Sequence, residues 1–293
     1  MSNLKDLRDR IASVKATQKI TQAMKMVAAS KLRRAQSDLD VARSYAQRMD
    51  TVIKNISSFA DDDRRFPELF VGTGRDQIHL LVIATSEKGL CGSFNSSIAK
   101  LARHRARELL DLGKEVKILC IGSKGVELLK SEFHLIMMPP INFSEVKGIT
   151  YEKASDISNK VLSMFHASQF DVATLFYSKF HSVISQIPTA RNIIPSRSIG
   201  QEDDSLVFSR NYDYEPDQLD VLNQLLPCYL VVQIFRVLLE NAASEQGARM
   251  SAMDHAASNA GEMIDQLTLT FNRQRQAQIT KELIEIISGA EAL

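Results

Sequence analysis

Cysteines and long apolar runs are scarce in this chain, and their scarcity excludes several classes of protein. The 293 residues include three cysteines, Cys91, Cys120 and Cys228, which stand far apart and form no CxxC pair. A disulfide framework or a zinc site is therefore not expected, and a reducing compartment is favoured. No apolar run approaches the ~18 residues that a membrane-spanning helix needs. We expect no secretory signal peptide, and Asp6 and Asp9 argue against a transit peptide.

Glycine, proline and acidic side chains are missing from most of the first sixty residues. No Pro or Gly occurs before Pro67, and no acidic residue lies between Asp9 and Asp38. Residues 1–60 carry twelve Lys and Arg against five Asp and no Glu, a net charge of +7, whereas the whole chain carries +1. This composition predicts a long basic helix. Such a helix would meet an anionic partner or pass through a crowded protein channel.

The apolar residues of this segment repeat at the three-and-four spacing of a coiled coil. They lie at positions 4, 7, 11 and 14, and again at 28, 32, 35, 39, 42, 46, 49, 53, 56 and 60. Between the two sets, positions 18, 21 and 25 are polar, and Ile20, Met24 and Val27 predict a seam displaced by about one position. A helix of about 55–60 residues is roughly 85–90 Å long, so it must project beyond any domain of this chain.

The C-terminal end carries a second seam with the same spacing. Its apolar positions are 250, 253, 257, 260, 264, 267 and 271. We expect this helix to begin near Pro227 and to run for about 60 residues. Two helices of similar length at opposite ends of one chain predict an antiparallel coiled coil. One stretch interrupts the pattern, because the residues NRQRQAQ at 272–278 are almost all polar.

Between the two helices, strands alternate with helices. The segments 77–86, 115–123 and 171–178 are typical of buried strands, and 181–196 is typical of an edge hairpin. The expected fold class is therefore α/β with a long coiled coil, in which an antiparallel helical pair adjoins a Rossmann-like domain with a largely parallel sheet. We expect four regions: an N-terminal shaft helix over 1–60, an exposed connector over 61–75, the α/β domain over 76–210, and a foot with the C-terminal shaft helix over 211–293.

Two motifs are similar to ligand-binding or catalytic sites, and both have a simpler structural interpretation. GSKG at 122–125 follows a strand and opens a helix, where a phosphate could bind, but it lacks the P-loop spacing. SEKGLCGSFN at 86–95 places Cys91 in a turn like a nucleophile elbow, yet no His completes a local motif. We interpret both as tight strand-to-helix turns and expect no catalytic residue, cofactor or metal.

Three alternatives stay open on residues alone. The seams permit a coiled-coil scaffold or adaptor, which would be a symmetric homodimer. The basic first helix permits a nucleic-acid binder, although Tyr45 is the only aromatic residue before Phe59. An enzyme would have to lose its activity when Cys91 is replaced by Ala.

Five stretches resemble the gamma subunit of F-type ATP synthases, and together they reach across the whole chain. IASVKATQKITQAMKMVAASKLRRAQ (11–36) is similar to the N-terminal helix of that family. EKGLCGSFN (87–95) and IGSKG (121–125) are similar to turns of its α/β domain, and SEQGARMSAMDHAASNAGEMI (244–264) to the start of its C-terminal shaft. The last stretch matches the family signature at Ile279, Thr280, Glu282, Glu285, Gly289, Ala290 and Ala292.

The resemblance implies a non-catalytic rotor that couples rotation of a c ring to ATP synthesis or hydrolysis at three beta-subunit sites. Its partners would be the alpha and beta subunits, with one gamma subunit per three of each, the epsilon subunit and the c ring, and no nucleic acid. It would lie peripherally on the cytoplasmic face of a bacterial plasma membrane, with a processed mitochondrial form as the alternative. The inserted cysteine pair of chloroplast relatives is missing, so thiol control is not expected.

The resemblance also assigns contacts to individual residues. The expected beta-subunit contacts are Met24, Lys25, Arg249, Arg275 and Gln276. The expected foot on the c ring consists of Tyr212, Tyr214 and Glu215. The apolar collar of the head would be contacted by Leu283, Ile286 and Ile287. In this interpretation the polar stretch 272–278 forms and breaks hydrogen bonds as it passes each beta site, where an apolar surface would be trapped.

Overall fold

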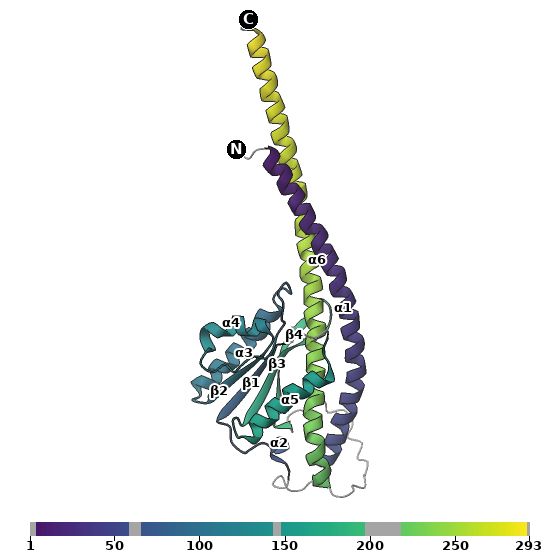
Figure 1. The fold of residues 1–293 in the computed structure, drawn as a ribbon, viewed down its shortest axis with the longest axis vertical. Coiled ribbons are helices and arrows are strands. Elements are labelled where there is room, and N and C mark those ends of the chain that lie inside the picture. The colour runs from purple at the N-terminus through teal and green to yellow at the C-terminus, as the bar shows by residue number, and fades with distance from the viewer. Residues whose placement is uncertain (1–3, 59–65, 143–147, 197–217, 292–293) are drawn as a thin grey trace.

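The computed structural model is a long helical shaft with an α/β domain beside its lower half (Figure 1). It describes residues 4–58, 66–142, 148–196 and 218–291. Helix α1 (Leu4–Ser58) and helix α6 (Gln218–Glu291) run antiparallel, so that the start of α1 and the end of α6 both point away from the α/β domain. The expected fold class, an antiparallel coiled coil with a central α/β domain, is confirmed.

The seam of α1 continues without displacement along the helix. Its buried members are Leu7, Thr21, Ala28, Leu32, Leu39, Ala46 and Ile53. The displaced seam expected around 18–25 is wrong, because Ile20 and Val27 are 59% and 56% exposed. Gln18 and Lys25 hold the regular positions instead, and they bond to a carbonyl (3.5 Å) and a carboxylate (2.6 Å) of α6. Polar side chains are tolerated on the seam here because they find partners across it.

Helix α6 is longer than expected, with 74 residues against 55 in α1. The predicted start at Pro227 is wrong, because Pro227 lies inside the helix, which begins at Gln218. A proline inside a helix removes one backbone hydrogen bond. However, Leu222 and Leu226 before it are buried in the same core as Tyr229 after it. Burial of these side chains therefore stabilises the turns that precede the proline.

Because the two helices differ in length, the end of α6 extends beyond α1 (Figure 1). The guanidinium of Arg8, near the start of α1, lies 5.9 Å from the ring centroid of Phe271. Beyond this level, every residue from Arg275 to Ala290 is exposed. At about 1.5 Å per residue, this bare stretch is about 24 Å long.

By length and composition α6 is also the one helix, within the described ranges, that could cross a membrane. The searched helix spans Leu219–Ala290, and 56% of its most apolar window is buried inside the protein. Core helices pass the same test, and the lower half of α6 is such a helix, since it packs on the sheet and on α1.

The α/β domain is built on a four-stranded sheet in the order β2–β1–β3–β4. Strands β1 (Ile78–Ala84), β2 (Glu115–Ile121) and β3 (Val172–Phe180) are parallel, as expected from the three buried runs. The edge hairpin expected within 181–196 is wrong in detail, because this segment holds the single strand β4 (Gln186–Ile194). Strand β4 pairs antiparallel with β3, so the hairpin is formed by β3 and β4.

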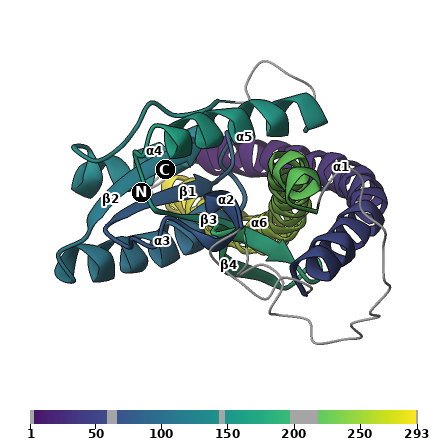
Figure 2. The same ribbon diagram turned by 90° about the horizontal axis from the view of Figure 1, so that it is seen from below.

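Helices cover both faces of the sheet, and Figure 2 shows α3 (Phe94–Asp111) and α5 (Tyr151–His166) on opposite sides of the strands. Helix α3 and helix α4 (Ser123–Phe133) share one core with the sheet, around Ile83 and Ile98. Helix α5 and the lower half of α6 share the other, around Leu80 and Leu230. Since α6 belongs both to this core and to the shaft, the domain and the shaft are one packed unit.

The predicted connector is not exposed throughout. Within it, the short helix α2 (Glu68–Val71) buries Leu69 and Phe70 in the core that contains α6. These two side chains lie where the chain passes from the shaft to the sheet, and their burial stabilises the fold. Residues 61–65 of the connector lie outside the described residues, as do the expected foot residues Tyr212, Tyr214 and Glu215.

Candidate partner-binding surfaces

The loop after β1 and the start of α4 form one interlocked turn. The first three N–H groups of α4, at residues 123–125, donate to Glu87, to the Ser86 carbonyl and to Thr85 at 2.8–3.2 Å. Gly122 has a φ of +93°, and a Cβ there would lie 2.4 Å from the Thr85 carbonyl oxygen. These donors are therefore occupied by the protein, and GSKG is a tight strand-to-helix turn rather than a phosphate site.

Cys91 belongs to the same turn. Its side chain is buried, and its sulfur accepts a hydrogen bond from the Asn95 amide nitrogen at 3.2 Å. That amide also donates to the Ser86 hydroxyl (2.8 Å) and accepts from the Ser86 N–H (3.0 Å). The sulfur is thus part of the bonding of the turn and is not open to a substrate. The turn presents the exposed side chain of Leu90 at its tip.

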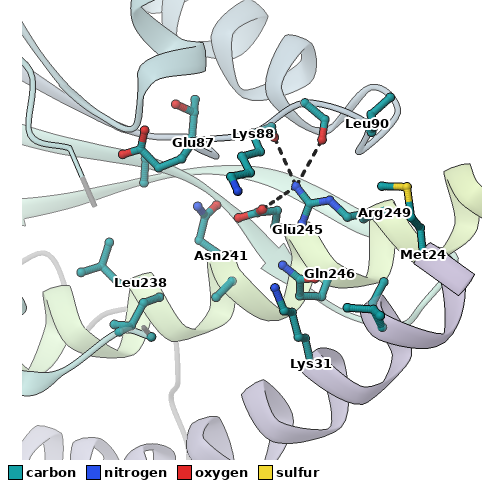
Figure 3. Close-up of a pocket in the computed structure, with 18 of the residues that line it drawn as sticks. Met24, Lys31, Glu87, Lys88, Leu90, Leu238, Asn241, Glu245, Gln246 and Arg249 are labelled. Atoms are coloured by element: carbon teal, nitrogen blue, oxygen red, sulfur yellow. Dashed lines mark hydrogen bonds and ion pairs between the residues drawn. The ribbon is translucent and has the colours of Figure 1, made fainter. Parts of the chain in front are cut away.

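A pocket of about 710 Å³ lies between this turn, α1 and α6 (Figure 3). We call it the neck pocket, because it lies where the α/β domain meets the shaft. From α1 it is lined by Ile20, Met24, Val27 and Lys31, which are spaced i, i+4, i+7 and i+11 and so share one face of the helix. This face lies beside the coiled-coil seam, which explains why Ile20 and Val27 are exposed.

Arg249 ties α6 to the turn across the neck pocket (Figure 3). Its Nη2 donates to the carbonyl oxygens of Lys88 (3.2 Å) and Gly89 (3.3 Å) and pairs with the Glu245 carboxylate (2.7 Å). The Arg249 and Glu245 side chains are 14% and 20% exposed. Burial raises the pKa of Glu245, and the guanidinium of Arg249 opposes that rise. Arg249 therefore shapes the turn as well as lining the pocket.

The five expected beta-subunit contacts fall into two groups. Met24 and Arg249 line the neck pocket. Lys25 lies next to it on the seam, where its ammonium pairs with an aspartate of α6 at 2.6 Å. Arg275 and Gln276 lie on the bare end of α6. The 26 residues from Arg249 to Arg275 span about 39 Å of helix, so the two groups are separate surfaces.

The second group belongs to a surface that we call the distal segment, residues 272–290. It contains the signature residues Ile279, Thr280, Glu282, Glu285, Gly289 and Ala290, all of them exposed. The bonds described within it, such as Thr280 to the Gln276 carbonyl (2.9 Å), join neighbouring turns of the same helix. Its large apolar side chains, Ile279, Leu283, Ile284, Ile286 and Ile287, are 49–68% exposed. An apolar stripe of this kind is typical of a protein-binding surface.

Sequence reasoning missed most of the neck pocket. It recognised Ile20, Met24 and Val27 as apolar but assigned them to the seam. Their i, i+4, i+7 spacing, which Lys31 continues, would have fitted a second helix face running beside an unbroken seam. The α6 side of the pocket, with Asn241, gave no such signal, because its residues come close to the turn only in the folded chain.

Comparisons with known proteins agree with one another. The family described as ATP synthase matches residues 3–293. The ATP synthase gamma chain of Sinorhizobium fredii is 58% identical over 295 residues, and that of Brucella ovis is 55% identical over 293 residues. Both alignments cover 100% of this chain and 100% of the relative.

Solved structures are also similar to this chain. A chain of the central stalk and c ring of the Tetrahymena thermophila mitochondrial ATP synthase has a TM-score of 0.60 and 29% identity, over 81% of this chain and 99% of that one. A chain of the Euglena gracilis mitochondrial ATP synthase has a TM-score of 0.66 and 18% identity, over 99% of this chain and 94% of that one, which supports the fold. This chain therefore belongs to the ATP synthase family and, within it, to the gamma chains.

Proposed function

We propose that this chain, as the central-stalk rotor subunit of an ATP synthase, drives the three beta sites in turn through the distal segment and the neck pocket, and itself catalyses no reaction. The observation that carries the proposal is the bare end of α6. A single helix that extends about 24 Å beyond its coiled-coil partner, with exposed apolar side chains, requires a surrounding partner to cover it. The head of alternating alpha and beta subunits is such a partner.

The polar part of the distal segment is suited to contacts that form and break. Arg275 and Gln276 are exposed, and neither side chain makes a hydrogen bond or ion pair within the described residues. Both are free to bond to each beta subunit in sequence as the shaft turns. Moving one beta site from 1:99 to 99:1 in favour of one conformation requires about 5.5 kcal/mol of differential binding. Two or three charge-assisted hydrogen bonds of about 1.5–3 kcal/mol each would supply it.

The apolar part of the distal segment has a different task. Leu283, Ile286 and Ile287 are more than half exposed, and they follow the polar stretch toward the end of the helix. We assign them to the apolar collar of the head, where the contact must turn freely. Non-directional apolar contacts change little in energy as the helix rotates, so they suit a bearing.

At the neck pocket we assign different roles to the expected contacts. Met24, together with the exposed Ile20, Val27 and Leu90, offers an apolar surface to the mobile region of a beta subunit. Arg249 acts through the turn, since its Nη2 donates to the Lys88 and Gly89 carbonyls. Lys25 contributes a contact at the rim, where its ammonium is paired with Asp254.

The base of the rotor would join the membrane-embedded part of the complex. By family resemblance Tyr212, Tyr214 and Glu215 rest on the c ring, and the epsilon subunit binds beside the α/β domain. The gamma subunit is part of a membrane-associated complex. We place it peripherally, on the cytoplasmic face of a bacterial plasma membrane.

The scaffold alternative has no support, because the coiled coil is made by the two ends of one chain and needs no second copy. The comparisons likewise identify a gamma chain.

Reconstitution tests the proposal. The chain is mixed with purified alpha and beta subunits, and complex mass and ATP hydrolysis are measured, with a mixture lacking the chain as control. We expect one complex with a single copy per three beta subunits and a strongly raised rate. A homodimer of the chain, or alpha and beta subunits with unchanged mass and rate, would contradict the rotor role.

A further inference from the structure

A polar cluster joins α1 to α6 at the base of the shaft. Its centre is Asp50 of α1, whose Oδ1 accepts hydrogen bonds from the Tyr229 hydroxyl (2.7 Å) and the Gln233 amide (2.8 Å) of α6. The other carboxylate oxygen lies 3.9 Å from Nη1 of Arg236. Tyr229 and Gln233 are buried, and Asp50 is partly buried. One carboxylate on α1 is thus held by three side chains that are spaced i, i+4 and i+7 and share one face of α6.

The cluster continues from α6 toward the sheet. Nε of Arg236 pairs with the buried carboxylate of Glu240, one turn further along α6, at 3.3 Å. Glu240 also acts on the Tyr177 side chain of β3, where burial together with the charge of Glu240 raises the pKa of Tyr177 to about 12. The phenol therefore stays protonated at neutral pH and can donate to the carboxylate. Polar side chains thus extend from α1 through α6 toward β3.

Two further bonds hold α6 to the same strand. The Ser178 N–H of β3 donates to Asn241 Oδ1 at 3.0 Å, and the Ser244 hydroxyl donates to the Ser178 carbonyl at 2.8 Å. All three side chains are buried. Ser178 is thus bonded to two side chains that lie within one turn of α6.

These polar groups lie within a contact surface that is otherwise apolar. Leu222, Leu226, Leu230 and Val237 of α6 pack in the surrounding core with Ile53 of α1. Apolar side chains that interlock here already restrict rotation and sliding, but their contacts are non-directional and oppose a small twist less sharply than hydrogen bonds do. A buried polar group on a seam is satisfied in one register only, and it specifies that register.

We infer that Asp50, Tyr229, Gln233, Arg236 and Glu240 form a torsional clamp, which prevents α1 and the α/β domain from twisting against α6 while the rotor carries load. The inference rests on the rotor role of the chain and does not require the beta-subunit contacts proposed above. A rotor that is loaded at the α/β domain and delivers torque at the distal segment loses part of each step if these elements twist. The directional bonds at the base resist that twist.

The test measures torsional stiffness in the assembled complex. The head is fixed to a surface and locked with a non-hydrolysable ATP analogue, and the angular fluctuation of a bead attached to the α/β domain is recorded. The main variant combines Asp50→Leu, Gln233→Leu and Tyr229→Phe, which removes the bonds to Asp50 and retains apolar packing. Asp50→Asn removes only the charge, and Asp40→Asn makes the same change at an exposed site on α1.

The triple variant is expected to raise the angular variance about twofold, if directional bonds and apolar packing share the restoring torque about equally. Asp50→Asn should raise it less, and Asp40→Asn should leave it unchanged. Unchanged angular variance in the triple variant would overturn the clamp. If the melting temperature falls while the variance stays unchanged, the cluster only stabilises the fold. If the triple variant fails to assemble, the angular variance of Asp50→Asn is used instead, and an unchanged variance there would overturn the clamp. Failure of the beta contacts would appear instead as an unstimulated ATPase in the wild-type complex.

Discussion

Replacing Arg249 by Ala removes the tie between α6 and the turn that borders the neck pocket. The substitution deletes the hydrogen bonds to the Lys88 and Gly89 carbonyls and the ion pair with Glu245. The seam of the coiled coil is left intact, so we expect the chain to fold and the turn to open more often.

The magnitude follows from burial. Removing one partner of a buried charge pair costs about 3–5 kcal/mol of stability, whereas an exposed pair contributes about 0–1 kcal/mol of stability. Arg249 and Glu245 are 14% and 20% exposed, which places the pair between these limits. The two carbonyls can bond to water once the arginine is gone, which reduces the loss. We therefore expect the opening free energy of the turn to fall by about 2 kcal/mol, which corresponds to about 30-fold in an equilibrium constant.

The defect should depend on pH through Glu245. Burial already holds the pKa of this carboxyl above its ordinary value of 4.5, and removing Arg249 raises the pKa further. A carboxyl with a raised pKa binds its proton more tightly when folded, so stability falls as pH rises from about 4.5 through the folded pKa. The variant should accordingly lose more stability at neutral pH than at pH 5, and adding Glu245→Gln should abolish this difference.

Amide hydrogen exchange in the reconstituted complex is the appropriate assay, because it reports local opening. The Ser86 and Phe94 amides are bonded within the turn, to the Asn95 side chain (3.0 Å) and the Cys91 carbonyl (3.3 Å). Exchange at these amides should rise about 30-fold in Arg249→Ala. The control, Lys281→Ala, breaks an exposed pair in the distal segment and should leave the turn unchanged. Wild-type exchange rates in Arg249→Ala would refute the reasoning.

Three further predictions concern the distal segment, the turn at Gly122 and the ion pair of Lys25. Arg275→Ala or Gln276→Ala should weaken coupling or rotation-linked ATPase without lowering the melting temperature, and normal activity in both would sink that assignment. Gly122→Ala should destabilise the α/β domain by about 3 kcal/mol or more, because the new Cβ would lie 2.4 Å from a backbone oxygen. The control, Gly113→Ala, has open space around the new Cβ and should cost only about 1 kcal/mol. Equal melting temperatures of the two variants would contradict this. Lys25→Ala should lower the free energy of unfolding by less than about 1 kcal/mol, and by less still at high salt, since both partners of its ion pair are partly exposed. A large loss of stability that does not depend on salt would contradict this.

The secondary structure could be predicted where a local pattern is strong. The heptad spacing of α1 and the three buried runs of the sheet were found from sequence, because residues three, four or two apart reveal which face of an element is buried. The start of α6 was predicted wrongly, since the local signal at Pro227 favours a helix start. Burial of Leu222 and Leu226 against residues elsewhere in the chain overrides that signal.

The candidate surfaces differ in the same way. The distal segment was recognisable because its polar stretch and signature are contiguous in sequence. The neck pocket was not, because the partners of Arg249 are 160 and 161 residues away along the chain.

The sequence by itself determined that two long helices and a largely parallel sheet form, and the match to a family signature determined which kind of protein this is. Only the tertiary structure decided that Arg249 bonds to the turn, that α6 continues past α1, and that Asp50 meets Tyr229, 179 residues further along the chain. The physical reason is that periodicity specifies the buried face of a helix but not the polar group opposite it. That pairing depends on the register in which all the buried side chains pack together.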